Sequence, residues 1–137
     1  MFNRIHSIIR RPERGWDPVP EGHATNYARS IWEKGVDGEL LARLERDIGG
    51  FSGKNILDLG GGPGHYSVAL AKRGAHVTWY DISARYRRVA EARARENQVS
   101  VLFALGYLDE VRSHLSGTFD LVLCNICFNY GWGDWSF

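Results

Sequence analysis

NILDLGGGPGHY, at residues 55–66, is an apolar run that ends in an acid and leads into a glycine-rich turn. VTWYD, at residues 77–81, is a second apolar run that ends in another acid. The segment between them has the length of one helix. Two apolar strands joined through a helix predict the start of a parallel sheet with a right-handed crossover.

The glycine-rich turn at residues 60–64 contains four glycines and Pro63. Glycine allows positive φ and lets a ligand approach where a Cβ would block it. Pro63 fixes φ and suits the entry to a helix. We therefore expect a preset turn whose amide groups face a ligand at the positive end of the following helix.

Two acids flank this turn, Asp58 and Asp81. In nucleotide-binding folds, an acid about 20 residues after the first glycine ends the second strand and accepts hydrogen bonds from ribose hydroxyls. Asp81 lies close to this spacing from Gly60. A lone glycine-rich turn is often only a tight connection. The combination of strand, acid, glycines, helix, strand and second acid predicts a nucleoside-binding site.

The same alternation continues along the chain. It predicts strands at residues 55–59, 76–80, 99–105 and 119–125, and helices at residues 64–73, 83–97 and 108–115. Strands separated by helices indicate an α/β fold with a mainly parallel sheet. The ligand of such a sheet lies at the carboxyl ends of the strands, where Asp58, Asp81 and Asn125 are expected to project.

The N-terminal part of the chain is expected to be an arm followed by two helices. Residues 1–22 are rich in Arg and Pro and predict an arm or lid, so the domain proper is residues 23–137. Helices are expected at residues 26–34 and 37–48. Tyr27 and Trp32 lie in the first of these, and they either cap a ligand or, as we favour, belong to the core.

The glycine spacing separates two kinds of nucleoside site. The dinucleotide pattern G-x-G-x-x-G fails, because its third glycine is replaced by His65 or Ser67. D-x-G-x-G-x-G does match, and with it residues 54–125 resemble the first half of a class I S-adenosylmethionine-dependent methyltransferase. The resemblance implies a Rossmann-like three-layer sandwich that binds S-adenosylmethionine and releases S-adenosylhomocysteine.

The resemblance also implies roles for individual residues. The acid of the first motif lies near the methionine amino group, the glycines cradle ribose and methionine, and the second acid holds the ribose hydroxyls. An apolar residue then packs on the adenine, and a third motif lies beside the adenine amino group. The implied cofactor-binding residues are Asp58, Gly60, Gly61, Gly62, Gly64, Asp81, Ile82, Gly106, Tyr107 and Asn125.

The implied reaction is an in-line displacement at the sulfonium methyl, which a protein assists mainly by alignment and desolvation. The resemblance favours methyl transfer to a small-molecule acceptor, and no catalytic residue is identified. The first alternative is a half-domain that binds cofactor or a partner chain without catalysis. A nicotinamide oxidoreductase is the second, and the glycine spacing disfavours it.

Composition indicates a compact cytoplasmic domain. The chain has 137 residues and a net charge of +1, and it has no apolar run near the ~18 residues of a membrane span. The arginines at 85, 87, 88, 93 and 95 spread around one helix, so we expect a solvated face and no nucleic-acid binding. No metal site is expected, and Cys124 and Cys127 are expected to be thiols.

Only four of the seven strands typical of class I methyltransferases are recognisable, so the last three are expected to be missing. The strand at residues 119–125 would then form a sheet edge, which is a template for pairing with another chain. Either the chain is a fragment of a longer protein, or two copies form a homodimer along that edge.

Overall fold

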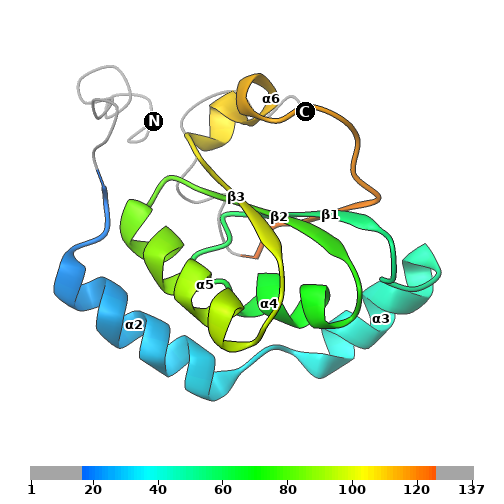
Figure 1. The fold of residues 1–137 in the computed structure, drawn as a ribbon, viewed down its shortest axis with the longest axis horizontal. Coiled ribbons are helices and arrows are strands. Elements are labelled where there is room, and N and C mark those ends of the chain that lie inside the picture. Colours follow the sequence, from blue (N-terminus) through cyan, green and yellow to red (C-terminus); the bar gives the residue numbers. More distant parts are fainter. Residues whose placement is uncertain (1–16, 126–137) are drawn as a thin grey trace, which may run out of the picture.

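A computed structural model describes residues 17–125 of the chain (Figure 1). The strands are β1 (Asn55–Leu59), β2 (His76–Asp81), β3 (Val101–Leu105) and β4 (Leu121–Leu123). The helices are α2 (Glu21–Lys34), α3 (Gly38–Ile48), α4 (His65–Lys72), α5 (Ala84–Glu96), the 3-10 turn η1 (Leu108–Glu110) and α6 (Val111–His114).

All four strands are parallel, in the order β3-β2-β1-β4. The prediction of a parallel α/β sheet is therefore confirmed, and among the described strands β4 lies at one edge of the sheet. In the register, Asp58 on β1 lies beside Trp79 on one side and Leu123 on the other. Parallel pairing brings the carboxyl ends of all four strands to the same edge of the sheet, where the two predicted acids lie.

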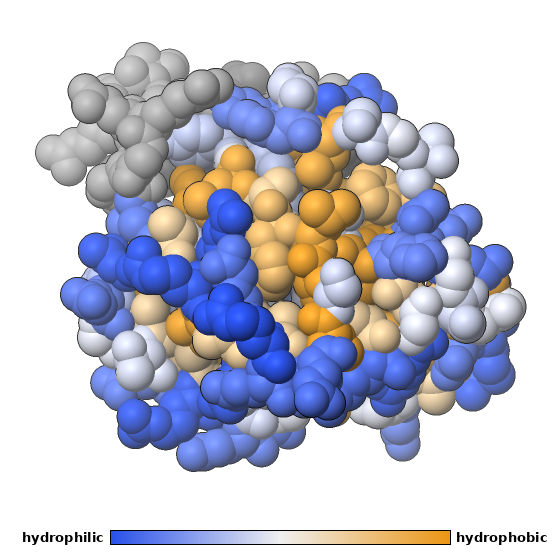
Figure 2. Space-filling view, viewed as in Figure 1, coloured by the Kyte–Doolittle hydropathy of each residue, from blue (hydrophilic) through white to orange (hydrophobic). Residues whose placement is uncertain are grey.

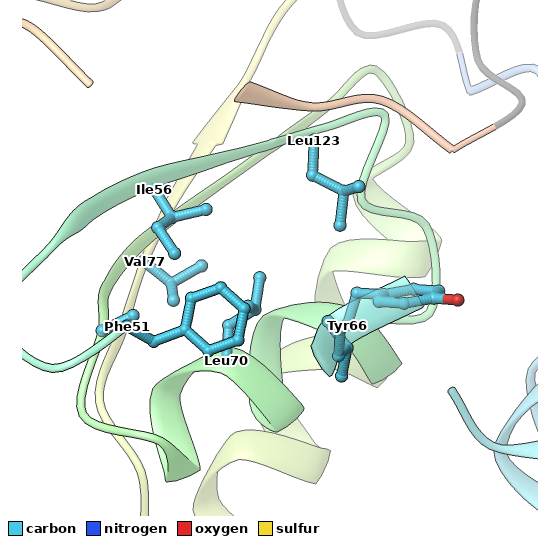
Figure 3. Close-up of a cluster of buried hydrophobic side chains, with 8 residues drawn as sticks. Phe51, Ile56, Tyr66, Leu70, Val77 and Leu123 are labelled. Atoms are coloured by element: carbon cyan, nitrogen blue, oxygen red, sulfur yellow. The ribbon is translucent and has the colours of Figure 1, made fainter. Parts of the chain in front are cut away.

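One face of the sheet is covered by α3, α4 and α5, with α2 alongside α5 (Figure 1). The main core lies between this face and the helices. Figure 3 shows how side chains from the strands, α4 and the loop before β1 converge there. Its buried members are Leu41, Phe51, Ile56, Tyr66, Leu70, Ala75, Val77 and Leu123.

Among the described residues, η1 and α6 cover part of the opposite face of the sheet (Figure 1). Leu57, Leu59 and Tyr80 pack there against Val111 of α6. Leu102 and Val122 keep 72% and 52% of their surface exposed. Figure 2 shows apolar residues gathered in the centre of the view, around the strands.

The helix predicted at residues 26–34 begins earlier, at Glu21. It starts directly after Pro20, whose extended backbone (ψ 143°) precedes the first turn. Its buried residues are Ala24 and Ala28, so its packed stripe is made of small side chains. The first five residues of the helix contain no large apolar side chain, so the sequence pattern does not indicate them.

The strand predicted at residues 119–125 is shorter, with only Leu121–Leu123 in β4. Before this strand, Asp120 contacts β1 through its side chain, because its carboxylate accepts a hydrogen bond from the Asn55 amide at 2.8 Å. The helix predicted at residues 108–115 is divided into η1 and α6. Among residues 17–125, no helix has both the length and the apolar character needed to cross a membrane.

Candidate functional site

The glycine turn lies between β1 and α4 at the carboxyl edge of the sheet. Gly60, Gly62 and Gly64 have φ of 72°, 51° and 83°, a region that L side chains rarely adopt, so the backbone favours glycine at these three positions. The predicted preset turn is present. It connects the end of β1 to the N-terminus of α4 over Asp81 of β2.

The amide groups of this turn are already bonded within the protein. The Gly60 and Gly61 amides donate to the Tyr80 carbonyl at 2.7 and 3.2 Å, and the Gly64 amide donates to the Gly61 carbonyl at 3.0 Å. The Gly62 amide donates to Asp81 Oδ2 at 2.9 Å. The expectation that these amides face a ligand is therefore wrong, since β2 and the turn itself provide their acceptors.

Trp79 of β2 lies directly beneath the turn. Its indole N–H donates to the Gly62 carbonyl at 3.0 Å, and its side chain is fully buried against the ring of Phe103. A Cβ on Gly61 would overlap this indole, coming within 2.5 Å of Nε1. Gly61 is thus explained by the close approach of Trp79.

Trp32 of α2 reaches the same turn from the other side. Its indole N–H donates to the Pro63 carbonyl at 2.9 Å, and the Arg93 guanidinium lies over the indole at 5.0 Å. Trp32 is therefore at the predicted site, as a support of the turn. Tyr27 lies elsewhere on α2, 42% exposed and near the ring of Tyr86.

Asp81 bridges the glycine turn and the start of α5. Its two carboxylate oxygens accept hydrogen bonds from the amides of Gly62 and Ser83, both at 2.9 Å. Burial raises the pKa of Asp81, and these backbone hydrogen bonds oppose that rise. The carboxylate is therefore held in a fixed orientation between β2 and the turn.

Asp58 lies behind the turn, with only 3% of its surface exposed. One of its carboxylate oxygens accepts a hydrogen bond from the Ser67 hydroxyl of α4 at 2.6 Å. Burial raises the pKa of Asp58 to about 6, and the nearby charge of Asp81 adds to this rise. At pH 7 the Asp58 carboxyl is therefore mainly ionised, which favours a cationic group close by.

His65 begins α4 directly after the turn. Its Nδ1 atom is buried and has no hydrogen-bond partner among the described residues. Burial lowers the pKa of His65 to about 4, so the ring is neutral at pH 7. A buried polar atom without a partner is uncommon, and here it lies next to the predicted ligand site.

The remaining predicted residues follow the ends of the strands. Ile82 is half-buried after Asp81, and Asn125 is exposed two residues after β4. The Gly106 amide donates to the Asp81 carbonyl at 3.1 Å. The buried Tyr107 accepts a hydrogen bond from the Tyr80 hydroxyl at its carbonyl (2.7 Å), and a Cβ on Gly106 would overlap that hydroxyl.

Asp17 is a contributor that no sequence pattern singles out. Its carboxylate accepts hydrogen bonds from the Ser83 hydroxyl at 2.9 Å and from the Arg85 amide at 2.8 Å. Although burial raises the pKa of Asp17, hydrogen bonds led by that from Arg85 outweigh it, and the pKa is lowered. Residues 17–20 thus lie against α5, whereas residues 1–16 of the predicted arm lie outside the described residues.

Other candidate chemistry gives little support for a second site. Within the described part of the chain, no group of three or more potential metal ligands occurs. Cys124 is disulfide-bonded, so the prediction of a thiol is wrong for this residue, and Cys127 lies outside the described residues. A hollow lined by His76, Leu102 and Phe119 lies toward the amino ends of the strands, away from the two carboxylates.

Comparison with known proteins identifies the family of this chain. Residues 56–136 match the family model described as a methyltransferase domain. The chain is 31% identical to the ubiquinone biosynthesis O-methyltransferase of Bordetella pertussis over 81% of this chain and 43% of that protein. It is 36% identical to the enzyme of the same name from Pseudomonas aeruginosa over 90% of this chain and 51% of that protein.

Solved structures give the same result. An S-adenosylmethionine-dependent methyltransferase from Thiobacillus denitrificans, in complex with S-adenosyl-L-homocysteine, has a TM-score of 0.60 and 26% identity over 80% of this chain and 44% of that chain. Magnesium protoporphyrin IX methyltransferase from Synechocystis PCC 6803, with the same ligand bound, has a TM-score of 0.54 and 27% identity over 90% of this chain and 52% of that chain. The chain spans about half the length of these relatives.

Proposed function

Because this chain belongs to the class I S-adenosylmethionine-dependent methyltransferases, we propose that it transfers a methyl group from S-adenosylmethionine to an oxygen atom of a small-molecule acceptor. One structural observation carries the cofactor part of this proposal. Asp58 and Asp81 lie at the carboxyl ends of the adjacent parallel strands β1 and β2, one before and one after the glycine turn along the chain. The acceptor part rests on the names of the relatives.

The residues present fit S-adenosylmethionine. Its methionine end carries an ammonium group, which the charge of Asp58 favours, whereas the pyrophosphate of a dinucleotide would be repelled. The oxygens of Asp81 each accept one amide hydrogen bond and have a further lone pair for a ribose hydroxyl. The unpartnered Nδ1 of His65 offers one more polar contact at the same edge.

The protein's part in the reaction is binding and alignment. When bound, the cofactor supplies an electrophilic methyl group on a sulfonium. We propose that Asp81 and Ile82 hold the adenosine end and that Asp58 holds the methionine end, while the glycine turn, which lacks Cβ atoms, lets the ligand approach the backbone closely. The acceptor oxygen would form a bond to this methyl carbon as the carbon–sulfur bond breaks, and the proton of the acceptor hydroxyl would pass to solvent. We assign no catalytic base among the described residues.

Methyl transfer itself is the test of this function. The chain would be incubated with S-adenosylmethionine labelled in its methyl group and with matched aromatic acceptors that carry a hydroxyl, an amine or a thiol. We expect label in the hydroxyl compound. Folded protein that binds the cofactor but labels none of these acceptors would favour the non-catalytic alternative.

An Asp81→Asn variant links the activity to the site. The amide retains the shape of the side chain and one acceptor oxygen but loses the charge. Loss of a charge-assisted hydrogen bond costs about 1.5–3 kcal/mol, so we expect KM for S-adenosylmethionine to rise by about one order of magnitude or more with a smaller change in kcat. An unchanged KM would remove Asp81 from the site.

A further inference from the structure

Two tryptophans support consecutive carbonyl groups of the glycine turn. The indole N–H of Trp79 donates to the Gly62 carbonyl at 3.0 Å, and the indole N–H of Trp32 donates to the Pro63 carbonyl at 2.9 Å. Trp79 comes from the central part of the sheet, whereas Trp32 comes from a helix before β1. Elements far apart in the sequence therefore meet at two consecutive peptide units of the turn.

The Pro63 carbonyl is a sensitive point of the turn. Gly62 and Pro63 are both buried, and a buried carbonyl without a partner is costly. Gly62 also donates its amide to Asp81, and His65 follows one residue after Gly64. A displacement of Pro63 would therefore move Gly62, which is hydrogen-bonded to Asp81, on one side and His65 on the other. Both Asp81 and His65 are proposed to contact the cofactor.

Trp32 is itself held in place. The Arg93 guanidinium of α5 lies 5.0 Å from the centre of its ring, which is within the range of a cation–π interaction. Ala24 and Ala28 of α2 are buried, and α2 packs against α5. The indole N–H is thus presented to the turn by a docked helix, and the position of α2 is coupled to the position of Pro63.

We propose that Trp32 is a positioning residue of the cofactor site, which holds the Pro63 carbonyl and so keeps the glycine turn in the conformation that binds S-adenosylmethionine. This inference rests on the proposed function. Linkage makes the effect reciprocal, so bound cofactor stabilises the docking of α2 by the same free energy that docked α2 contributes to binding.

A Trp32→Phe variant isolates the hydrogen bond. Phenylalanine keeps an aromatic ring for Arg93 and for packing but removes the N–H donor. We expect its dissociation constant for S-adenosylhomocysteine, measured by calorimetry, to be about fivefold higher than that of the unchanged chain, since one hydrogen bond contributes about 1 kcal/mol. Tyr27→Phe is the matched control, because it removes one polar group from the same helix and should leave the dissociation constant within about twofold.

A spectroscopic measurement on the unchanged chain separates positioning from a purely structural role. The indole N–H resonance of Trp32, assigned by its absence from the Trp32→Phe spectrum, should shift during titration with S-adenosylhomocysteine and saturate with the calorimetric dissociation constant. A purely structural donor, remote from the ligand, would give an unmoved resonance.

Three results would overturn the inference. Trp32→Phe could bind S-adenosylhomocysteine as tightly as the unchanged chain, or the Trp32 resonance could stay in place at saturation. In both cases the unchanged chain binds the ligand, so the proposed function stands and only the role of Trp32 falls. No binding by the folded, unchanged chain would overturn the proposed function and this inference with it.

Discussion

A Gly61→Ala substitution tests the packing beneath the glycine turn. The new Cβ would come within 2.5 Å of Trp79 Nε1, and the indole is fully buried with Phe103 beside it. Overpacking of this kind costs about 1–3 kcal/mol. Displacement of the indole would also leave the Gly62 carbonyl without its donor, at a further cost of about 1 kcal/mol or more.

We therefore expect Gly61→Ala to lower the free energy of unfolding by about 3 kcal/mol. For a domain of this size that corresponds to a fall in Tm of roughly 10 °C. Urea denaturation followed by circular dichroism measures the free energy, and the midpoint of a thermal melt gives Tm.

Gly62→Ala is the matched control for Gly61→Ala. Gly62 has φ +51°, and among the described residues a Cβ there meets nothing nearer than the Gly60 carbonyl oxygen at 4.0 Å. Its cost is then only that of a left-handed backbone, about 1 kcal/mol. Backbone conformation alone predicts the opposite order, so a larger loss for Gly62→Ala than for Gly61→Ala would refute the reasoning.

Two further predictions concern charged groups. The pKa of Asp58 is raised to about 6 in the folded chain, so protonation of Asp58 adds to stability as pH falls from 6 toward 4. His65 has the opposite effect. Its pKa is lowered to about 4 in the folded chain, so it destabilises the fold as pH falls below 6.5. The Tm of Asp58→Asn should therefore fall more steeply than the Tm of the unchanged chain between pH 6.5 and 4.5. Parallel curves of Tm against pH would contradict this. Asp17→Ala removes an acceptor for the Arg85 amide at the start of α5 and should lower the free energy of unfolding by about 1 kcal/mol at pH 7, with no change if the contact is absent in solution.

The regular part of the fold was predictable because its signals are local. The apolar runs before Asp58 and Asp81, and the helix between them, determine two parallel neighbours in the sheet. Parallel pairing then places both acids at one edge. The positions of these acids and of the glycine turn followed from the order of strands and helices along the chain.

The supports of the turn were not predictable, because they depend on contacts between distant segments. Trp32 and Pro63 are 31 residues apart, and Ser83 and Asp17 are 66 residues apart. No spacing rule connects such pairs. The acceptor role of the Tyr80 carbonyl, which takes the Gly60 and Gly61 amides, is likewise visible only once β2 lies beside β1.

The shortened β4 has a similar origin. The apolar pattern at residues 119–125 predicts a strand, but pairing with β1 begins through Asp120, whose amide donates to the Asn55 carbonyl at 2.7 Å. The ladder itself covers only Leu121–Leu123. Pairing of two copies along β4 stays a prediction, and the mass of the protein in solution tests it.

Calorimetric titration of S-adenosylhomocysteine into the purified chain, with NADH as the parallel ligand, tests the central claim most directly. The arrangement of Asp58, Asp81 and the glycine turn predicts saturable binding of S-adenosylhomocysteine and no heat from NADH beyond dilution. Binding of NADH, or a folded chain that binds neither ligand, would contradict the assignment of this edge of the sheet as an S-adenosylmethionine site.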